Sequence, residues 1–440
     1  QVSYIPPQLG VFFDGTGNNR HNDLKYWDDA HEPTNIAKLY ELYPAKSTRM
    51  FESVYIDGIG TAPDKKDDDI DMAFARSFGT RLESAIDSAQ KFFSDHPRAP
   101  VGVLDVFGFS RGAAAARAFI NEVHKINNTE PRFWGGPRLV VRFLGLFDTV
   151  GSIGLPGDND NGPFILDIHP DAVAYAYHIT ARDERREYFP CSSLQVEAYR
   201  MPAAHFAEEA LLGAHSDIGG GYGPVPQIVF YPPESCTWNA SDERDRHVAR
   251  ISGKLKAEYS KKYHWPGIDI QFKTRNEDGA DSLNKTTIYP YWERDVKTQL
   301  AHCALHKMHA VAMQRGVPLE PLDTLLGTAA FRGHHPERVY AIPEELEELL
   351  DQMYANMHEV DAENHVLQHY VHHSHQYAAD PDAVVNANKP ESGPKIAAPN
   401  QVRELFYNNI DNAHAPDDVW RLVQSPDETQ YTWVRQKRAE

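Results

Sequence analysis

Apolar runs and amphipathic stretches alternate along the first half of the chain. Four apolar runs of strand length occur at Leu9–Phe13, Ser53–Ile56, Val101–Phe107 and Leu139–Phe147, and Ala210–Leu212 has the character of a strand end. Residues 34–43, 70–93 and 113–123 carry apolar side chains at helical spacing. Strands that alternate with helices predict an α/β fold with a mainly parallel sheet and helices on both of its faces.

The pattern changes after Pro224. Residues 224–295 are rich in Pro, Tyr and charged residues and show little periodicity. Residues 296–315 and 343–360 have the spacing of helices, and residues 378–400 have the composition of a loop or linker. We therefore predict a core over residues 1–225 and a mostly helical accessory region over residues 226–440, part of which returns to pack on the core.

Length and charge narrow the class of protein. The chain has 440 residues, whereas single hydrophobic cores stop growing at roughly 250–300 residues. Its net charge of −19 argues against nucleic acid as a partner, because binding to phosphates requires clustered Lys and Arg. The same charge argues against a purely electrostatic attraction to anionic lipid, so any contact with a membrane would have to be apolar.

The three cysteines, Cys191, Cys236 and Cys303, are too few and too widely spaced to form a disulfide framework. We expect the chain to be made and folded in a reducing cytoplasm. No apolar run approaches the roughly 20 residues that span a bilayer. The first ten residues lack the basic and apolar regions of a signal peptide.

The strongest chemical signal is Gly108-Phe-Ser110-Arg-Gly112, which matches G-x-S-x-G. An apolar run precedes it and an Ala-rich helical stretch follows it, which is the context of a nucleophile elbow. Such a turn holds the serine in a strained conformation and presents its hydroxyl at the carboxyl edge of the sheet. We therefore predict Ser110 as the nucleophile of an α/β-hydrolase fold. The alternative is a chance match in a loop.

A serine nucleophile needs a base and an acid that orients the base, and in this fold they follow in the order Ser, Asp or Glu, His. Asp148 comes directly after the apolar run 139–147, and His215 lies in the Gly-rich stretch 213–222. We assign Asp148 as orienter and His215 as base. The alternatives are a helix cap for Asp148 and a structural histidine bonded to Asp217 for His215. Asp183 and Glu184 have charged neighbours typical of a salt-bridged helix.

Backbone amides are the expected oxyanion donors. The Arg111 amide lies at the start of the helix that follows Ser110, where the helix dipole favours negative charge. The second donor would be the amide of Gly15 or Thr16, in the turn after the first strand. That turn could also be a plain turn or a phosphate nest, but no Gly-Lys-Ser/Thr follows, which excludes a P-loop. The turn at 57–61 could line the same cleft.

Other polar clusters give weaker signals. His365, His369 and His372 share a helical face, as do His302, His306 and His309. No H-E-x-x-H motif is present, and a core or surface role is the simpler interpretation. We predict no metal and no cofactor.

Six motifs occur in a fixed order: Phe13-Asp-Gly-Thr-Gly-Asn18, Asp57-Gly-Ile-Gly-Thr61, Gly108-Phe-Ser-Arg-Gly112, Phe147-Asp-Thr-Val-Gly-Ser152, Asp183-Glu-Arg-Arg186 and Gly213-Ala-His-Ser-Asp-Ile-Gly-Gly-Gly-Tyr222. Together they resemble the uncharacterised-type α/β-hydrolase domain of the type VI secretion lipase effectors, phospholipase A class. The resemblance covers roughly residues 9–225.

The resemblance implies hydrolysis of acyl esters in membrane glycerophospholipids by a triad that falls on Ser110, Asp148 and His215. It also implies an antibacterial toxin that is carried by the tip protein of the secretion spike. Such a toxin acts in the periplasm of a rival cell and is neutralised in the producer by an immunity protein. The region after Pro224, where Tyr and Trp accumulate, would help to engage the membrane.

Two other functions fit the same residues. One is a soluble carboxylesterase or thioesterase, which would show no rate increase when its substrate becomes micellar or vesicular. The other is a binding or scaffold protein with an inactive pocket, which would not react with a fluorophosphonate at Ser110.

Overall fold

The structure is a computed structural model. It describes residues 5–25, 27, 31–44, 49–59, 73–129, 135–151, 153, 161–186, 189–224, 226–230, 233–262, 269–277, 284–355, 360–372, 403–413, 418–424 and 431–437. The helices and strands below are those of the described residues.

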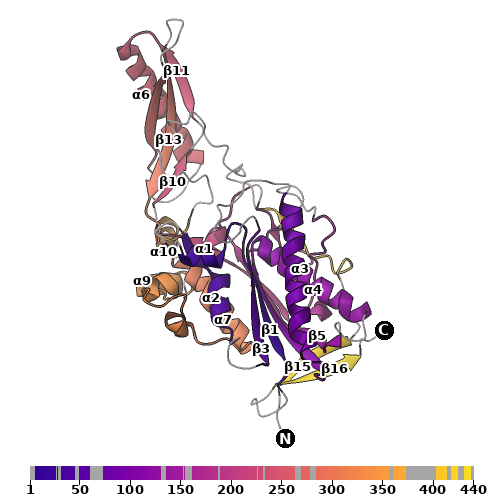
Figure 1. Cartoon of the computed structure of the whole chain (residues 1–440). Helices are drawn as coiled ribbons and strands as arrows, with labels where there is room; N and C mark the ends of the chain where they lie inside the picture. The colour runs from indigo at the N-terminus through magenta and orange to yellow at the C-terminus, as the bar shows by residue number, and fades with distance from the viewer. Residues whose placement is uncertain are drawn as a thin grey trace.

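A six-stranded sheet forms the centre of the molecule (Figure 1). In spatial order it contains β3 (Phe51–Ile56), β1 (Gln8–Phe13), β4 (Val101–Phe109), β5 (Arg138–Phe147), β6 (Ala176–Ala181) and β8 (Phe206–Leu211). All five neighbouring pairs are parallel. The predicted parallel α/β sheet is therefore confirmed, and the four full-length strands predicted from sequence all belong to it.

Helices cover both faces of this sheet because its strands are apolar on both sides. On one face α3 (Ala73–Ser94) and α4 (Arg111–Thr129) enclose a core that includes Phe78, Phe119 and Val106. On the other face α2 (Asn35–Glu41) and α7 (Leu300–Gln314) enclose a second core around Phe12 and Phe107. Figure 1 shows the two layers on either side of β1 and β3.

Residues after 226 contribute to both the core and a separate module. Ala304, Leu305 and Met308 of α7 belong to the second core. Beyond them lie the 3₁₀ helix Leu322–Gly327, α8 (Pro336–Val339), α9 (Glu344–Ala355) and α10 (Val360–His369). The last two helices pack on each other through residues such as Leu346 and Val366.

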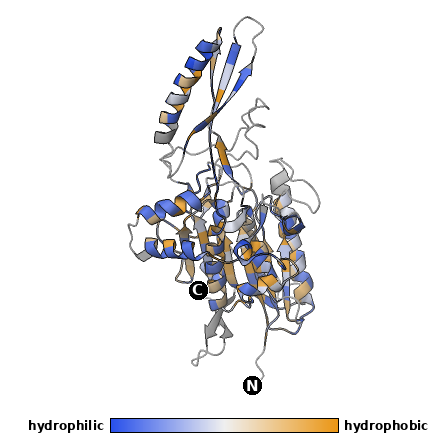
Figure 2. Ribbon diagram, turned by 90° about the vertical axis from the view of Figure 1, so that its left-hand side faces the viewer, coloured by the Kyte–Doolittle hydropathy of each residue, from blue (hydrophilic) through white to orange (hydrophobic). Residues whose placement is uncertain are grey.

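A four-stranded antiparallel sheet projects away from the main sheet (Figures 1 and 2). It contains β10 (Gln227–Phe230), β11 (Glu234–Trp238), β12 (Gln271–Glu277) and β13 (Asn284–Arg294), with β13 paired to the other three. Helix α6 (Ser241–Lys262) covers it through a small core that contains Leu255, Ile288 and Trp292. Among the described residues, the apolar core of this module is small, which fits the weak periodicity of its sequence.

Short elements complete the fold. They are α1 (Arg20–Lys25), β2 (His31–Thr34), the 3₁₀ helix Pro170–Ala172, β7 (Cys191–Ser192), α5 (His215–Gly219), β9 (Gly220–Tyr222), β14 (Leu405–Phe406), β15 (Asp418–Gln424) and β16 (Tyr431–Lys437). Strand β14 pairs with β7, β2 with β9, and β15 with β16. Within the described residues, no helix combines the length and the apolar composition that crossing a bilayer requires.

One local prediction was wrong. The charged neighbours of Asp183 and Glu184 suggested a helix, but β6 ends at Ala181 and these residues lie in the turn that follows. Both carboxylates are buried, and they accept hydrogen bonds from backbone amides of another loop, which offset the cost of their burial. The arginines beside them in sequence therefore do not mark a solvated helix.

Candidate active site

The carboxyl ends of the parallel strands bring the predicted residues to one edge of the sheet. Asp14 follows β1, Ser110 follows β4 and Asp148 follows β5. His215 begins α5, a few residues after the end of β8. In open α/β sheets this edge is where ligands bind.

Ser110 lies at the sharp turn between β4 and α4, with a positive φ of 57°. The two flanking glycines are required by close backbone contacts. A Cβ at Gly108 would lie 2.5 Å from the Ala113 Cα, and one at Gly112 would lie 2.3 Å from the Asp14 carbonyl oxygen. The Ser110 amide donates to the Phe147 carbonyl (3.0 Å), which fixes the turn against β5. The elbow predicted from G-x-S-x-G is therefore present as a strained strand–turn–helix.

Asp148 lies next to this turn and is fully buried, also with a positive φ (41°). Its Oδ2 accepts a hydrogen bond from His215 Nδ1 (2.5 Å), and its Oδ1 accepts one from the Ala181 amide (2.8 Å). Arg403 donates to both oxygens, at 2.6 and 2.9 Å. Burial alone would raise the pKa of Asp148, but the Arg403 guanidinium and the bond from His215 outweigh it and hold that pKa well below its usual range.

His215 is only 4% exposed and Ser110 only 3%. The imidazole lies between Phe109, whose ring centroid is 4.7 Å away, and Phe189, at 5.1 Å. Because Phe109 precedes Ser110, this packing places the imidazole beside the elbow. Burial lowers the pKa of His215, and the bond to Asp148 offsets part of that effect. A neutral imidazole with its Nδ1 proton held by a carboxylate is the form that can accept a proton at Nε2.

Three carboxylates hold the loop that carries His215. Asp183 accepts from the Gly213 amide (2.9 Å), Asp217 from the Ala214 amide (2.9 Å), and Glu184 from the His215 amide (3.2 Å). Burial would raise the pKa of Glu184, but the Arg186 guanidinium lowers it to about 2, so this carboxylate is ionised at neutral pH.

Asp217 does not bind His215. It accepts hydrogen bonds from His372 Nδ1 (2.5 Å) and from the His372 amide (2.8 Å). The alternative of a structural His215 bonded to Asp217 is therefore wrong, and Asp217 instead helps to hold the Gly-rich loop.

The turn after β1 lies on the other side of the elbow. Asp14 accepts hydrogen bonds from the Gly15 amide (2.7 Å) and from the Tyr55 hydroxyl, and the Thr34 hydroxyl lies 2.9 Å from its Oδ1 and 2.7 Å from its Oδ2. Burial raises the pKa of Asp14 to about 6, against these hydrogen bonds. Arg111 Nη1 donates to Thr16 Oγ1 (3.4 Å), which ties the turn to the start of α4.

These contacts bear on the predicted oxyanion donors. The Gly15 amide is engaged by Asp14, so of the two alternatives in this turn the Thr16 amide is the better candidate. Arg111 is the first residue of α4, where amides have no acceptor within the helix. The neighbouring turn after β3 packs here through the bond from the Gly58 amide to the Asn18 carbonyl (2.9 Å). Gly60 and Thr61 of that predicted motif lie outside the described residues.

Comparison with known proteins gives the family. The family model "T6SS, Phospholipase effector Tle1-like, catalytic domain" matches residues 8–132 and 125–230, which together are slightly more than half of the 440 residues. The chain belongs to this family. It is thus a member of the type VI secretion phospholipase effectors, as its motifs led us to expect.

A solved structure of a Tle1 effector supports the fold of this chain. The chain is 23% identical to the protein in "Structure of the Tle1 effector bound to the VgrG spike from the Type 6 secretion system". The match covers 92% of this chain and 94% of that one, with a TM-score of 0.63. An uncharacterized protein from Pseudomonas aeruginosa matches at 16% identity over 87% of this chain and 61% of that one, with a TM-score of 0.40. No curated protein matches the sequence.

The histidine clusters of the effector have structural partners. On α7, His302, His306 and His309 each bond to a backbone carbonyl, at 2.8–2.9 Å. On α10, the His365 and His369 rings lie 4.5 Å apart, while His372 lies beyond the end of the helix. His373 and His375 lie outside the described residues. Among the residues that are described, no group of three or more side chains could hold a metal ion.

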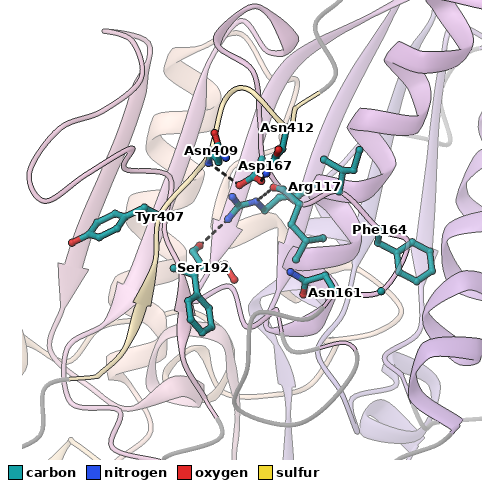
Figure 3. Close-up of a pocket in the computed structure, with 12 residues that line it drawn as sticks. Arg117, Asn161, Phe164, Asp167, Ser192, Tyr407, Asn409 and Asn412 are labelled. Carbon is teal, nitrogen blue, oxygen red and sulfur yellow. Dashed lines mark hydrogen bonds between the residues drawn. The ribbon is translucent and has the colours of Figure 1, made fainter.

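A polar pocket of about 480 Å³ lies apart from Ser110, Asp148 and His215, none of which lines it. Figure 3 shows Arg117 of α4 in the middle of the lining residues, bonded to the Ser192 carbonyl, with Asp167 and Asn409 above it in this view. Asn409 and Asn412 come from the C-terminal segment 403–413, which also supplies Arg403. The same segment therefore lines this pocket and reaches Asp148.

The sequence singled out the turn at Ser110, Asp148 and His215, which the structure places at one edge of the sheet, but it did not single out their neighbours Arg403 and His372. Nothing in the sequence near Arg403 indicates its role, since its partner is 255 residues away. His372 was noted only as part of a histidine-rich stretch.

Proposed function

We propose that this effector is a serine esterase that hydrolyses acyl esters of membrane glycerophospholipids, as a phospholipase A. One observation carries the proposal. The strained Ser110 turn and the Asp148–His215 pair lie together at the carboxyl edge of the sheet, in a chain of a phospholipase effector family.

In the proposed reaction, His215 Nε2 takes the Ser110 proton as the hydroxyl oxygen attacks the acyl carbonyl carbon. Asp148 holds the Nδ1 proton of His215, which keeps the correct tautomer and stabilises the imidazolium that forms. His215 then gives its proton to the leaving glycerol oxygen. Water attacks the acyl-enzyme, again with His215 as base, and releases the fatty acid.

Negative charge that develops on the acyl oxygen would be stabilised by the amides of Arg111 and Thr16. Both flank the elbow, and Arg111 begins a helix whose dipole favours an anion. The Gly15 amide could serve only after it releases Asp14. Removal of one such donor typically costs a factor of about 10²–10³ in rate.

The family supports delivery by the type VI system, and the related Tle1 effector was solved bound to a VgrG spike. We extend this to the present chain. It would bind the spike tip protein for export, act on the membrane from the periplasm of the target cell, and be blocked by an immunity protein in the producer. The accessory region 226–440 would take part in membrane contact.

The decisive experiment compares wild type with Ser110→Ala on vesicles of phosphatidylethanolamine and phosphatidylglycerol. We expect wild type to release fatty acid and lysophospholipid, and the variant to lose at least about 10⁴-fold in rate. Ser192→Ala is the matched control, since it removes another buried serine hydroxyl from the neighbouring β7. Unchanged release by Ser110→Ala would refute the mechanism.

The same assay separates a lipase from a soluble esterase. For a phospholipase we expect higher activity on vesicles than on short water-soluble esters. Efficient cleavage of soluble esters, with no increase at lipid surfaces, would instead favour the carboxylesterase or thioesterase alternative. Failure of a fluorophosphonate to label Ser110 would favour a protein without catalytic activity.

A further inference from the structure

Arg403 makes a two-pronged contact with the carboxylate that orients His215. Its Nη1 lies 2.6 Å from Asp148 Oδ1 and its Nη2 lies 2.9 Å from Oδ2. Oδ2 also binds His215, and Oδ1 also binds the Ala181 amide. The four bonds occupy both oxygens and leave the carboxylate one orientation. A planar guanidinium is the side chain best suited to fix the plane of a carboxylate.

The segment that carries Arg403 is firmly attached to the core. Strand β14 pairs with β7, and Arg403 Nε donates to the Phe189 carbonyl (2.7 Å). Asn408 is buried and exchanges two hydrogen bonds with the backbone of Ile168, at 2.7 and 2.9 Å. Arg403 is therefore held in place by its own bond to Phe189 and by the attachment of the residues that follow it, and its side chain is only 9% exposed.

The charged side chains around His215 form two pairs of opposite sign. Asp148 and Glu184 supply two negative charges, and Arg403 and Arg186 supply two positive charges. Cys191 also lies near Arg403, but burial raises the pKa of its thiol, so it adds no charge. On the side of α5, Asp217 faces His372 instead of His215.

A cation on Asp148 has two opposing effects on the base. It fixes the carboxylate for the bond to His215 Nδ1, and it reduces the attraction of that carboxylate for a protonated imidazole. Together with burial, which lowers the pKa of His215, this favours the neutral imidazole that general-base catalysis needs.

We propose that Arg403 is a positioning residue of the hydrolase, which acts through Asp148 to hold His215 in its neutral, correctly oriented form. The inference rests on the proposed function. It assigns the C-terminal segment 403–413 a part in catalysis, although Arg403 itself touches neither Ser110 nor substrate in the mechanism above.

The test measures kcat/KM against pH for the full chain with Arg403→Gln and Arg403→Lys. In Arg403→Gln the charge of Asp148 is no longer offset, so His215 should bind its proton more tightly. We expect the acid limb of the profile to move to higher pH. The ratio of kcat/KM in Arg403→Gln to kcat/KM in wild type should then be about tenfold lower at acid pH than at the pH where both activities are maximal. Arg403→Lys keeps the positive charge but loses the two-pronged contact of the guanidinium with Asp148. It should therefore lower the maximal kcat/KM but leave the acid limb of the pH profile close to that of wild type.

Arg142→Gln is the matched control. Arg142 is also buried and forms a two-pronged ion pair with a buried aspartate, Asp105, but within the sheet and away from the edge that holds Ser110. We expect it to reduce stability and leave the shape of the pH profile unchanged. If Arg403→Gln lowers activity by the same factor at every pH and leaves the shape of the profile unchanged, as we expect for Arg142→Gln, its role is only structural and the proposal is wrong.

A second readout covers variants that fold poorly. The rate at which a fluorophosphonate labels Ser110 also depends on neutral His215, and it can be followed on the folded fraction alone. The labelling rate should therefore show the same acid limb when it is plotted against pH. In Arg403→Gln this limb should move to higher pH. If wild type itself is not labelled, the proposed function fails. If wild type is labelled and the limb does not shift, only the inference on Arg403 fails.

Discussion

Two aspartate–histidine pairs lie beside each other in this effector, and their hydrogen bonds are alike. His215 Nδ1 lies 2.5 Å from Asp148, and His372 Nδ1 lies 2.5 Å from Asp217. All four side chains are buried. Bond length and burial therefore do not distinguish a pair suited to catalysis from a pair that holds the fold together.

The surroundings make the difference. The ring of His215 packs against Phe109, the residue before the strained Ser110, whereas the ring of His372 packs against Tyr222 at 4.2 Å. Asp148 is paired with the cation Arg403, whereas Asp217 binds the amides of Ala214 and His372. One pair thus lies beside Ser110, the proposed nucleophile, and the other clamps the chain after α10 to α5.

The two pairs are also linked, because Asp217 and His215 belong to the same short helix. The Asp217–His372 pair fixes the helix on which His215 is carried. An assay of activity alone would therefore respond to both pairs, and the comparison needs variants that separate the rate of the chemical step from the amount of folded protein.

The largest difference is expected for the two aspartates. Asp148→Asn should lower kcat/KM on phospholipid vesicles by about 10⁴-fold, because an amide cannot hold the Nδ1 proton and favours the wrong tautomer of His215. Asp217→Asn should lower it by less than about tenfold per folded molecule. Rates are normalised to the fraction that is folded by circular dichroism.

Asp217→Asn serves as the matched control because it also replaces a buried, histidine-bonded carboxylate by its amide. Equal losses in the two variants would mean that neither pair is more than structural, and the assignment of Asp148 would have to be abandoned.

The pKa of Asp14, a third buried carboxylate near the site, can be compared with that of Asp148. Asp14 has only hydroxyl and amide partners, and burial raises its pKa to about 6, in contrast to the lowered pKa of Asp148. Its folded-state pKa lies above 3.8, the usual value of an aspartate. The stabilisation from its protonated form is therefore fully present below about pH 4 and lost as pH rises through about 6.

Urea unfolding of wild type and Asp14→Asn from pH 4 to 7 measures this contribution, because only wild type titrates at this position. The free energy of unfolding of wild type should fall relative to that of the variant by about 2 kcal/mol over this pH range, because the raised pKa of about 6 lies within it and the usual value of 3.8 lies at its lower end. A difference between the two proteins that does not change with pH would show that Asp14 stays ionised.

The sequence predicted those parts of the site that have a local signature. The glycines around Ser110, the apolar run before Asp148 and the Gly-rich stretch around His215 each encode a strand end followed by a tight turn. The carboxyl ends of parallel strands meet at one edge, so these local signals were enough to bring the three residues together.

Contacts between distant segments left no such signature. Arg403 and His372 bind partners 255 and 155 residues away, and neither lies in a periodic pattern that points to the sheet edge. Strand β6 was missed because His178 interrupts its apolar run. That imidazole is buried between Glu208 (2.8 Å) and the Thr149 amide (3.0 Å). Satisfied polar groups inside a core are what hydrophobic patterning cannot detect.

The smallest effect is expected at His372. His372→Leu removes the Nδ1 donor and leaves the buried Asp217 carboxylate with only its amide partners. That should lower the free energy of unfolding by about 2 kcal/mol. His372→Asn places an amide donor near the same position and should recover part of the loss. Because His372 does not face Ser110 in our assignment, kcat/KM per folded molecule should stay within about threefold of wild type, with an unchanged acid limb. A large loss of kcat/KM in a fully folded His372→Asn variant would instead place the second pair in the catalytic machinery.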